Sequence, residues 1–218
     1  MRVPRLYAVL FAALLALTFT GTSFANSVTL TYKGHQGVIA KNGSPFIGYP
    51  YYFSINGSST LTPLMCDSYD NNISLGETWH ATVTPFLQGV GMFGSTASLD
   101  YKAAGLIFKS MLAGTLTTTQ AQWAVWGLFS SNARSNSFFT TINGASIDAT
   151  YLAAAGTAPN SSYNGLVLYT PIAGTQSIGG LPQEFIGYSA VPEPGSLLLF
   201  GTGLIGVAGA LRRKLAKT

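Results

Sequence analysis

A change of hydrophobic period in the middle of the chain decides the fold. Residues 98–129 read SLDYKAAGLIFKSMLAGTLTTTQAQWAVWGLF. In the first half of this stretch the apolar residues keep helical spacing, which predicts a helix over 98–113 with Gly114 as the residue that ends it. A second helix is predicted to start at Thr119 and to run to Phe129. The centre of the chain is therefore expected to be helical.

The segments on both sides of this stretch have the composition of strands. Asn56-Gly57 is the strongest hairpin signal in the chain, and a third helix is predicted over 147–155. Strands are predicted over 28–33, 49–55, 58–62, 78–83, 166–170 and 184–188, with a short apolar run over 64–67. The sequence therefore predicts an α+β fold, in which a β-sandwich or barrel-like sheet carries a helical insertion.

The N-terminus has the features of a secretory signal peptide. Arg2 and Arg5 precede an apolar run over 6–17, and Ser23-Phe24-Ala25 supplies small residues at the positions that a signal peptidase requires. Cleavage would leave Asn26 as the first residue, and the Sec translocon would be the export partner. The alternative is a signal anchor that remains in the membrane. We expect residues 1–25 to be a signal peptide and residues 26–190 to be the exported domain.

The C-terminus carries a motif in three parts. Pro192-Glu193-Pro194 is followed by an uncharged stretch over 195–211 and then by the basic cluster Arg212, Arg213 and Lys214. As a helix the stretch would be ~26 Å long, close to the thickness of a bilayer core. It is therefore predicted to be a C-terminal transmembrane helix with the basic cluster on the cytoplasmic side.

This order of elements resembles the PEP-CTERM sorting signal of Gram-negative bacteria. The resemblance covers residues 191–218 and implies that an exosortase recognises Pro192, Glu193 and Pro194. It further implies that the protein is tethered to the inner membrane before processing and then reaches the cell surface or an extracellular matrix. The sorting signal indicates the route of the protein and says little about the exported domain.

Charge and ligand counts exclude several functions for residues 26–190. Five cationic and six anionic side chains leave a net charge of −1, so nucleic-acid binding is not expected. Cys66 is the one cysteine, which rules out an intramolecular disulfide, and His35 and His80 are the two histidines. A structural zinc site lacks ligands, and we expect neither a metal nor a cofactor.

Cys66 has three possible roles. It is a buried small hydrophobe, or the nucleophile of a hydrolase with His80, or one half of a bond to a second side chain. Gln122 is the candidate partner, because Trp126 lies one helical turn further along the same face. The alternative for Gln122 is a capping box with Thr119. Gln120 is the other candidate partner, on a different face of the helix.

Cys66, together with the downstream run Gln122-Trp123-Ala124-Val125-Trp126, resembles the thioester domains of bacterial surface adhesins. The resemblance implies that the Cys66 thiol attacks the Gln122 side-chain amide and that Trp126 walls the pocket. The resulting thioester would be opened by a partner that bears an amine or a hydroxyl. Ala121 stands where the family has threonine.

Two functions are consistent with these features, and neither is an enzyme that turns over. The first is an exported surface or matrix protein that attaches covalently through a thioester of Cys66 and Gln122. The second is a non-reactive structural protein of an exopolysaccharide or biofilm matrix, in which Cys66 is buried and Gln122 only caps its helix.

Overall fold

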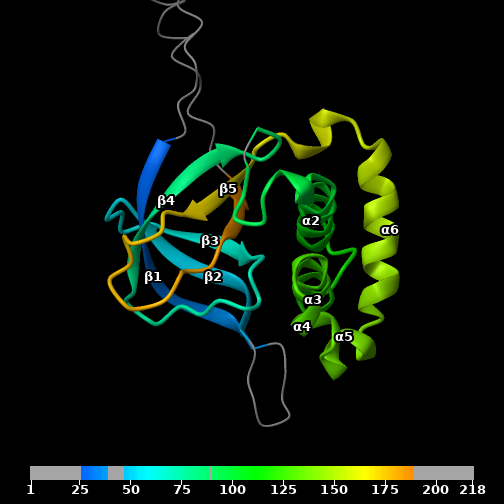
Figure 1. Ribbon diagram of the computed structural model, residues 1–218, viewed down its shortest axis with the longest axis horizontal. Coiled ribbons are helices and arrows are strands. Elements are labelled where there is room, and N and C mark those ends of the chain that lie inside the picture. Colours follow the sequence, from blue (N-terminus) through cyan, green and yellow to red (C-terminus); the bar gives the residue numbers. More distant parts are fainter. Residues whose placement is uncertain (1–25, 39–46, 89, 189–218) are drawn as a thin grey trace, which may run out of the picture.

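The strands close into an antiparallel barrel in the computed structural model, which describes residues 26–38, 47–88 and 90–188 (Figure 1). The order around the barrel is β1-β2-β3-β6-β5-β4. The strands are β1 (Asn26–Val38), β2 (Ile47–Ile55), β3 (Leu61–Cys66), β4 (Thr78–Pro85), β5 (Leu166–Pro171) and β6 (Phe185–Tyr188). Strand β3 pairs with β6, which follows the helical segment in the sequence, so residues on both sides of that segment close the barrel.

The helices lie between β4 and β5 in the sequence and form a layer on one side of the barrel (Figure 1). They are α2 (Ser98–Leu112), α3 (Thr118–Phe129), α4 (Ser131–Arg134), α5 (Ser137–Thr141) and α6 (Gly144–Thr157), with 3₁₀ turns η1 (Ser95–Ala97) and η2 (Asn160–Tyr163). Helices α2 and α3 pack between the barrel and α6. This layer brings residues of α3 to the ends of β2 and β3.

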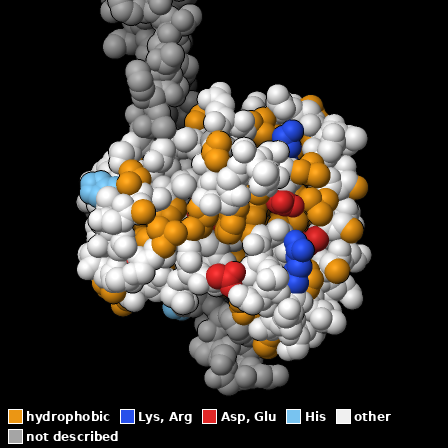
Figure 2. All heavy atoms as spheres, in the orientation of Figure 1, with side chains coloured by type: hydrophobic (Ala, Val, Ile, Leu, Met, Phe, Trp, Pro, Cys, Tyr) orange, Lys and Arg blue, Asp and Glu red, His pale blue; other side chains and the backbone are white. Residues whose placement is uncertain are grey.

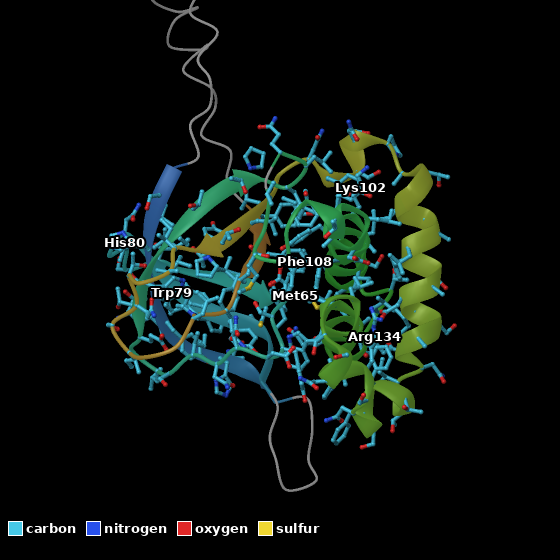
Figure 3. The ribbon with its side chains drawn as sticks, viewed as in Figure 1. Met65, Trp79, His80, Lys102, Phe108 and Arg134 are labelled. Atoms are coloured by element: carbon cyan, nitrogen blue, oxygen red, sulfur yellow. The ribbon has the colours of Figure 1, made fainter. Side chains whose placement is uncertain are left out.

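Two hydrophobic cores result from the alternation of side chains along the strands. One core fills the barrel and includes Leu64, Cys66 and Phe185, and the Phe53 and Phe185 rings lie 4.7 Å apart there. The other lies between barrel and helices and includes Met65, whose position between the two layers is labelled in Figure 3. Met65 and Cys66 therefore face opposite sides of the barrel wall.

The predicted α+β fold with a barrel-like sheet and a helical insertion is confirmed, with corrections to single elements. The strand predicted over 58–62 and the apolar run over 64–67 are one strand, Leu61–Cys66. Helix α3 starts at Thr118, and α6 is longer at both ends than the predicted helix over 147–155. Helices α4 and α5 were not predicted, since four and five residues are too few to show a helical period.

The predicted signal peptide, the Pro192-Glu193-Pro194 motif, the C-terminal transmembrane helix and the basic cluster Arg212, Arg213 and Lys214 lie outside the described residues. Among the described helices, none has the length and hydropathy of a membrane span.

The visible face of the protein carries few charges (Figure 2). Side chains of Lys, Arg, Asp and Glu are scattered over it, and hydrophobic side chains gather where the barrel meets the helical layer. On this face, the described residues form no basic patch for phosphates.

Asp148 of α6 differs from the charged residues on the surface, because its carboxyl group is buried within the helical layer. Burial raises the pKa of Asp148 to about 7, although Arg134 opposes the rise. The carboxyl is therefore protonated in the folded protein and ionised in the unfolded chain between about pH 4 and 7, so folding stability falls as the pH rises through this range. We expect Asp148→Asn to unfold with a free energy about 1–2 kcal/mol higher than that of wild type at pH 8, because asparagine has no charge to bury. Solvent and Arg134 already relieve part of the cost of burying the Asp148 charge, so the gain is smaller than the full pKa shift would give.

The measurement is urea unfolding of both proteins at several pH values. The gain should be absent near pH 4 and grow toward pH 8. A difference that is constant over this range would contradict a protonated Asp148.

Candidate functional site

Helix α3 begins with a capping box that involves Gln120 and leaves Gln122 available. Thr117 is the N-cap residue, and its hydroxyl accepts from the Gln120 N–H at 3.2 Å. The Gln120 side chain accepts in return from the Thr117 N–H at 3.0 Å. The alternative in which Gln122 caps the helix with Thr119 is therefore wrong, because the helix begins two residues earlier than that box requires.

The side-chain amide of Gln122 lies between the ends of β2 and β3. Its Nε2 donates to the Cys66 carbonyl oxygen at 2.6 Å, and its Oε1 accepts from the Tyr49 N–H at 3.2 Å. The Gln122 side chain is fully buried. Of the two candidates, Gln122 is therefore the one that the structure brings to Cys66.

The strand register explains why the amide fits there. Tyr51 pairs with Leu64, and continuing this register by two residues would place Tyr49 opposite Cys66. An unbroken ladder would join these two residues by a bond from the Tyr49 N–H to the Cys66 carbonyl. The Gln122 amide takes the place of this bond, with an acceptor for the first group and a donor for the second. The two strands are thus joined by the side-chain amide of Gln122, the residue that the thioester hypothesis names as the acyl donor.

The Cys66 thiol is fully buried at the end of β3, inside the barrel. It donates to the Ser68 carbonyl oxygen at 3.5 Å. Burial raises the pKa of the Cys66 thiol, and the neighbouring Asp67 raises it further, while hydrogen bonds with Trp126 and Ser68 oppose the rise. The thiol is consequently neutral at ordinary pH, and its nucleophilic form has to be generated during a reaction.

Aromatic side chains close the barrel end around Cys66. The Trp123 and Trp126 rings of α3 are 5.2 Å apart at 89°, and the Tyr69 ring lies 5.2 Å from Trp126. Trp126 belongs to the same core as Cys66 and is 3% exposed. The predicted wall residue Trp126 therefore lies beside the Cys66 thiol.

The segment that follows Cys66 is fastened to the short helices. The Asn136 side chain donates to the Tyr69 hydroxyl at 3.4 Å, and the Asn132 side chain donates to Asp70 at 2.7 Å. Helix α4 and the N-cap residue of α5, which the sequence did not predict, thus bind the segment that follows Cys66.

A buried carboxyl pair next to Cys66 was missed by the sequence reasoning. Asp67 and Glu184 are both fully buried, and the Asp67 N–H donates to the Glu184 carbonyl at 3.2 Å across β3 and β6. Burial raises the pKa of the Asp67 carboxyl well above its ordinary value, and the adjacent Glu184 carboxyl adds to the rise. The signal that was available is Asp67 itself, a charged residue at the end of an apolar run.

His80 does not approach Cys66. It is exposed on β4, at the side of the barrel away from the helices (Figure 3). Strand β4 pairs with β1 and β5, whereas Cys66 is on β3, so the two strands are not neighbours. The nucleophile and base of a Cys66–His80 hydrolase are therefore not assembled. Within the described part of the chain, no group of three or more His, Cys, Asp and Glu side chains is placed to hold a metal ion.

Comparison with protein families identifies one segment of the chain. Residues 190–214 match the PEP-CTERM protein-sorting motif. No curated protein and no solved structure matches the chain. The motif implies export by membrane-associated sorting, with an exosortase as the partner that recognises the signal.

Proposed function

We propose that this exported protein attaches covalently to a surface or matrix partner through an internal thioester between Cys66 and Gln122. The observation that carries the proposal is the placement of the Gln122 amide, which is buried and hydrogen-bonded to the main chain of Cys66. A flexible glutamine would have many other positions, and this one brings an acyl group to a thiol-bearing residue.

The bond-forming step needs a nucleophile, an acyl donor and a group that stabilises negative charge on oxygen. The Cys66 sulfur forms a bond to the Gln122 side-chain carbonyl carbon, and the carbon–nitrogen bond breaks. The amide nitrogen takes up the proton lost by the thiol and leaves as ammonia. The Tyr49 N–H already donates to the Gln122 oxygen and would stabilise the oxyanion that develops there.

The second step is the attachment. An amine or hydroxyl of the partner attacks the thioester carbon, becomes bonded to the Gln122 acyl group and returns the thiol of Cys66. Trp126, beside the thiol, would protect the thioester from hydrolysis until then. The protein reacts once and stays bonded to its partner, so it does not turn over. It would therefore be a covalent binding module and not an enzyme.

The sorting motif defines where this chemistry would act. A chain that is exported and sorted by an exosortase meets amines of surface proteins and hydroxyls of exopolysaccharides. We therefore place the attached protein at the cell surface or in the extracellular matrix, after a stage in which it is tethered to the inner membrane.

The second candidate is a non-reactive structural protein of the matrix. One observation favours it: the oxygen and the nitrogen of the Gln122 amide both have main-chain partners, and the buried thiol is neutral. In that case Gln122 only joins two strands.

The intact mass of the purified exported protein separates the two candidates. The mass of wild type is expected to be one ammonia below the mass calculated from its sequence, whereas Cys66→Ala should have its full calculated mass. Methylamine should add to wild type only. Gln120→Ala is the matched control and should keep the mass loss. A full mass with a thiol that reacts on unfolding would favour the structural protein.

A further inference from the structure

The last strand, β6, ends at Tyr188 at one rim of the barrel. Tyr188 pairs with Leu166, the first residue of β5, and the Leu166 carbonyl accepts from the Phe86 N–H at 3.0 Å, directly after β4. The ends of β4 and β6 and the start of β5 therefore meet where the chain leaves the barrel. The sorting motif covers residues 190–214 and so begins at the second residue after Tyr188.

The short chain after Tyr188 limits how the barrel can be oriented at a membrane. Residues 189–194 separate Tyr188 from the uncharged stretch over 195–211. Even fully extended, they reach at most about 25 Å. A globular domain of the size of residues 26–188 has a diameter of about 40 Å. Because the tether is shorter than the domain, a protein held in the membrane by the stretch over 195–211 keeps the Tyr188 end of its barrel nearest the lipid.

Two lysines of α2 lie at this end. The Phe108 ring is 5.9 Å from the Tyr188 ring, and the next residue, Lys109, donates at 2.7 Å to a carbonyl oxygen of η2, the turn before β5. Lys102 lies near the top of the view in Figure 3 and lines a small hollow together with Leu87, just after β4. Two cations therefore lie beside the point where the chain leaves the barrel.

Exposed apolar groups accompany these cations. The Tyr188 ring is 40% exposed, and Leu87 is 37% exposed. Tyrosine is enriched at the headgroup level of bilayers, because its ring is apolar and its tip is polar. We call this set the β6 rim: Leu87, Lys102, Lys109 and Tyr188. Its combination of cations and apolar groups fits a surface of anionic lipids.

The anionic side chains of the described residues are engaged elsewhere. Four of the six are buried: Asp67, Glu77, Asp148 and Glu184. Asp70 is bound by Asn132 of α4 at 2.7 Å, and Asp100 interacts electrostatically with Arg134. The charge of the β6 rim is therefore positive.

We propose that the β6 rim rests on anionic phospholipid headgroups of the inner membrane while the sorting signal tethers the protein there. The inference rests on the proposed tethered stage and does not depend on the thioester. Two ammonium groups would bind lipid weakly from solution, but the tether holds the rim at the bilayer, so weak contacts suffice. The partner is the lipid and not the exosortase, because the tether brings the rim to the bilayer before an enzyme has bound.

The test uses the full chain, reconstituted into phosphatidylglycerol vesicles in which some lipids carry a spin label on the headgroup. A fluorophore is attached to Asn164→Cys or to Ala173→Cys, two exposed positions that flank the two ends of β5. Cys66 is fully buried and takes no label, so the unsubstituted chain is the labelling control. Strand β5 is about 20 Å long, which exceeds the contact range of the quencher. The headgroup label is expected to quench the fluorophore at position 164 and not the one at position 173.

Single-lysine variants test the contribution of charge. Lys102→Gln should lower the ratio of quenched to unquenched protein at position 164 about fivefold, the factor that one lysine contributes near an anionic surface. Lys33→Gln is the matched control, because it removes the same charge from β1 near the start of β4, at the opposite end of the barrel. It should leave the ratio unchanged.

The outcomes separate this inference from the tethering on which it rests. If the chain does not float with the vesicles, the tethered stage and the inference both fail. If the chain floats but positions 164 and 173 are quenched equally, or Lys102→Gln and Lys33→Gln act alike, the β6 rim does not rest on lipid although the tether stands. Shielding of position 164 that appears only when exosortase is added would assign the rim to the enzyme and overturn the inference.

Discussion

Replacement of Gln122 by alanine is expected to lower the free energy of unfolding by about 3–5 kcal/mol, even where no thioester exists. The substitution leaves the Tyr49 N–H and the Cys66 carbonyl without their buried partner, and each such group costs about 1–3 kcal/mol. It also opens a cavity between α3 and the barrel, because the Gln122 side chain is among the largest that are fully buried.

The measurement is urea unfolding of Gln122→Ala in the Cys66→Ala background, where neither protein has a cross-link. Gln120→Ala in the same background is the matched control, two residues away on the same helix. It loses the capping box and should cost about 1 kcal/mol. Equal losses for the two glutamines would mean that the bridge between β2 and β3 does not support the fold.

The helix that carries Gln122 was predictable, but its first residue was not. Apolar spacing locates α3, yet Thr117 with Gln120 and Thr119 with Gln122 both fit a capping box. The structure selects the first, which leaves Gln122 free to face the end of β3 while Gln120 caps the exposed helix end. Burial thus decides between two local patterns that are equally good in the sequence.

The other members of the site depend on contacts between distant residues. The Glu184 N–H donates to the Ser68 hydroxyl across 116 positions, and nothing local in the sequence pairs the carboxyl groups of Asp67 and Glu184. The Tyr49 N–H is a main-chain donor and has no sequence signature at all. Alternation likewise predicted strands without deciding between sandwich and barrel, because the β3–β6 pairing that closes the barrel joins residues far apart.

Replacement of Cys66 by alanine is expected to cost about 4 kcal/mol through the loss of the proposed cross-link alone. The thioester would close a loop between residues 56 positions apart, and restricting the unfolded chain in this way stabilises the folded state by about that amount. Removal of the buried sulfur adds about 1 kcal/mol. The effect is therefore larger than packing around one thiol accounts for.

The urea dependence distinguishes a lost cross-link from lost packing. An unfolded chain without the cross-link exposes more surface, so the m-value of Cys66→Ala should exceed that of wild type. Wild type opened by methylamine should show the same higher m-value, although its sequence is unchanged. Packing loss alone would leave the m-value constant and would make the methylamine-treated protein identical to untreated wild type. Because methylamine acts only on the acyl group, a matching rise in both samples would assign the stabilisation to the bond between Cys66 and Gln122.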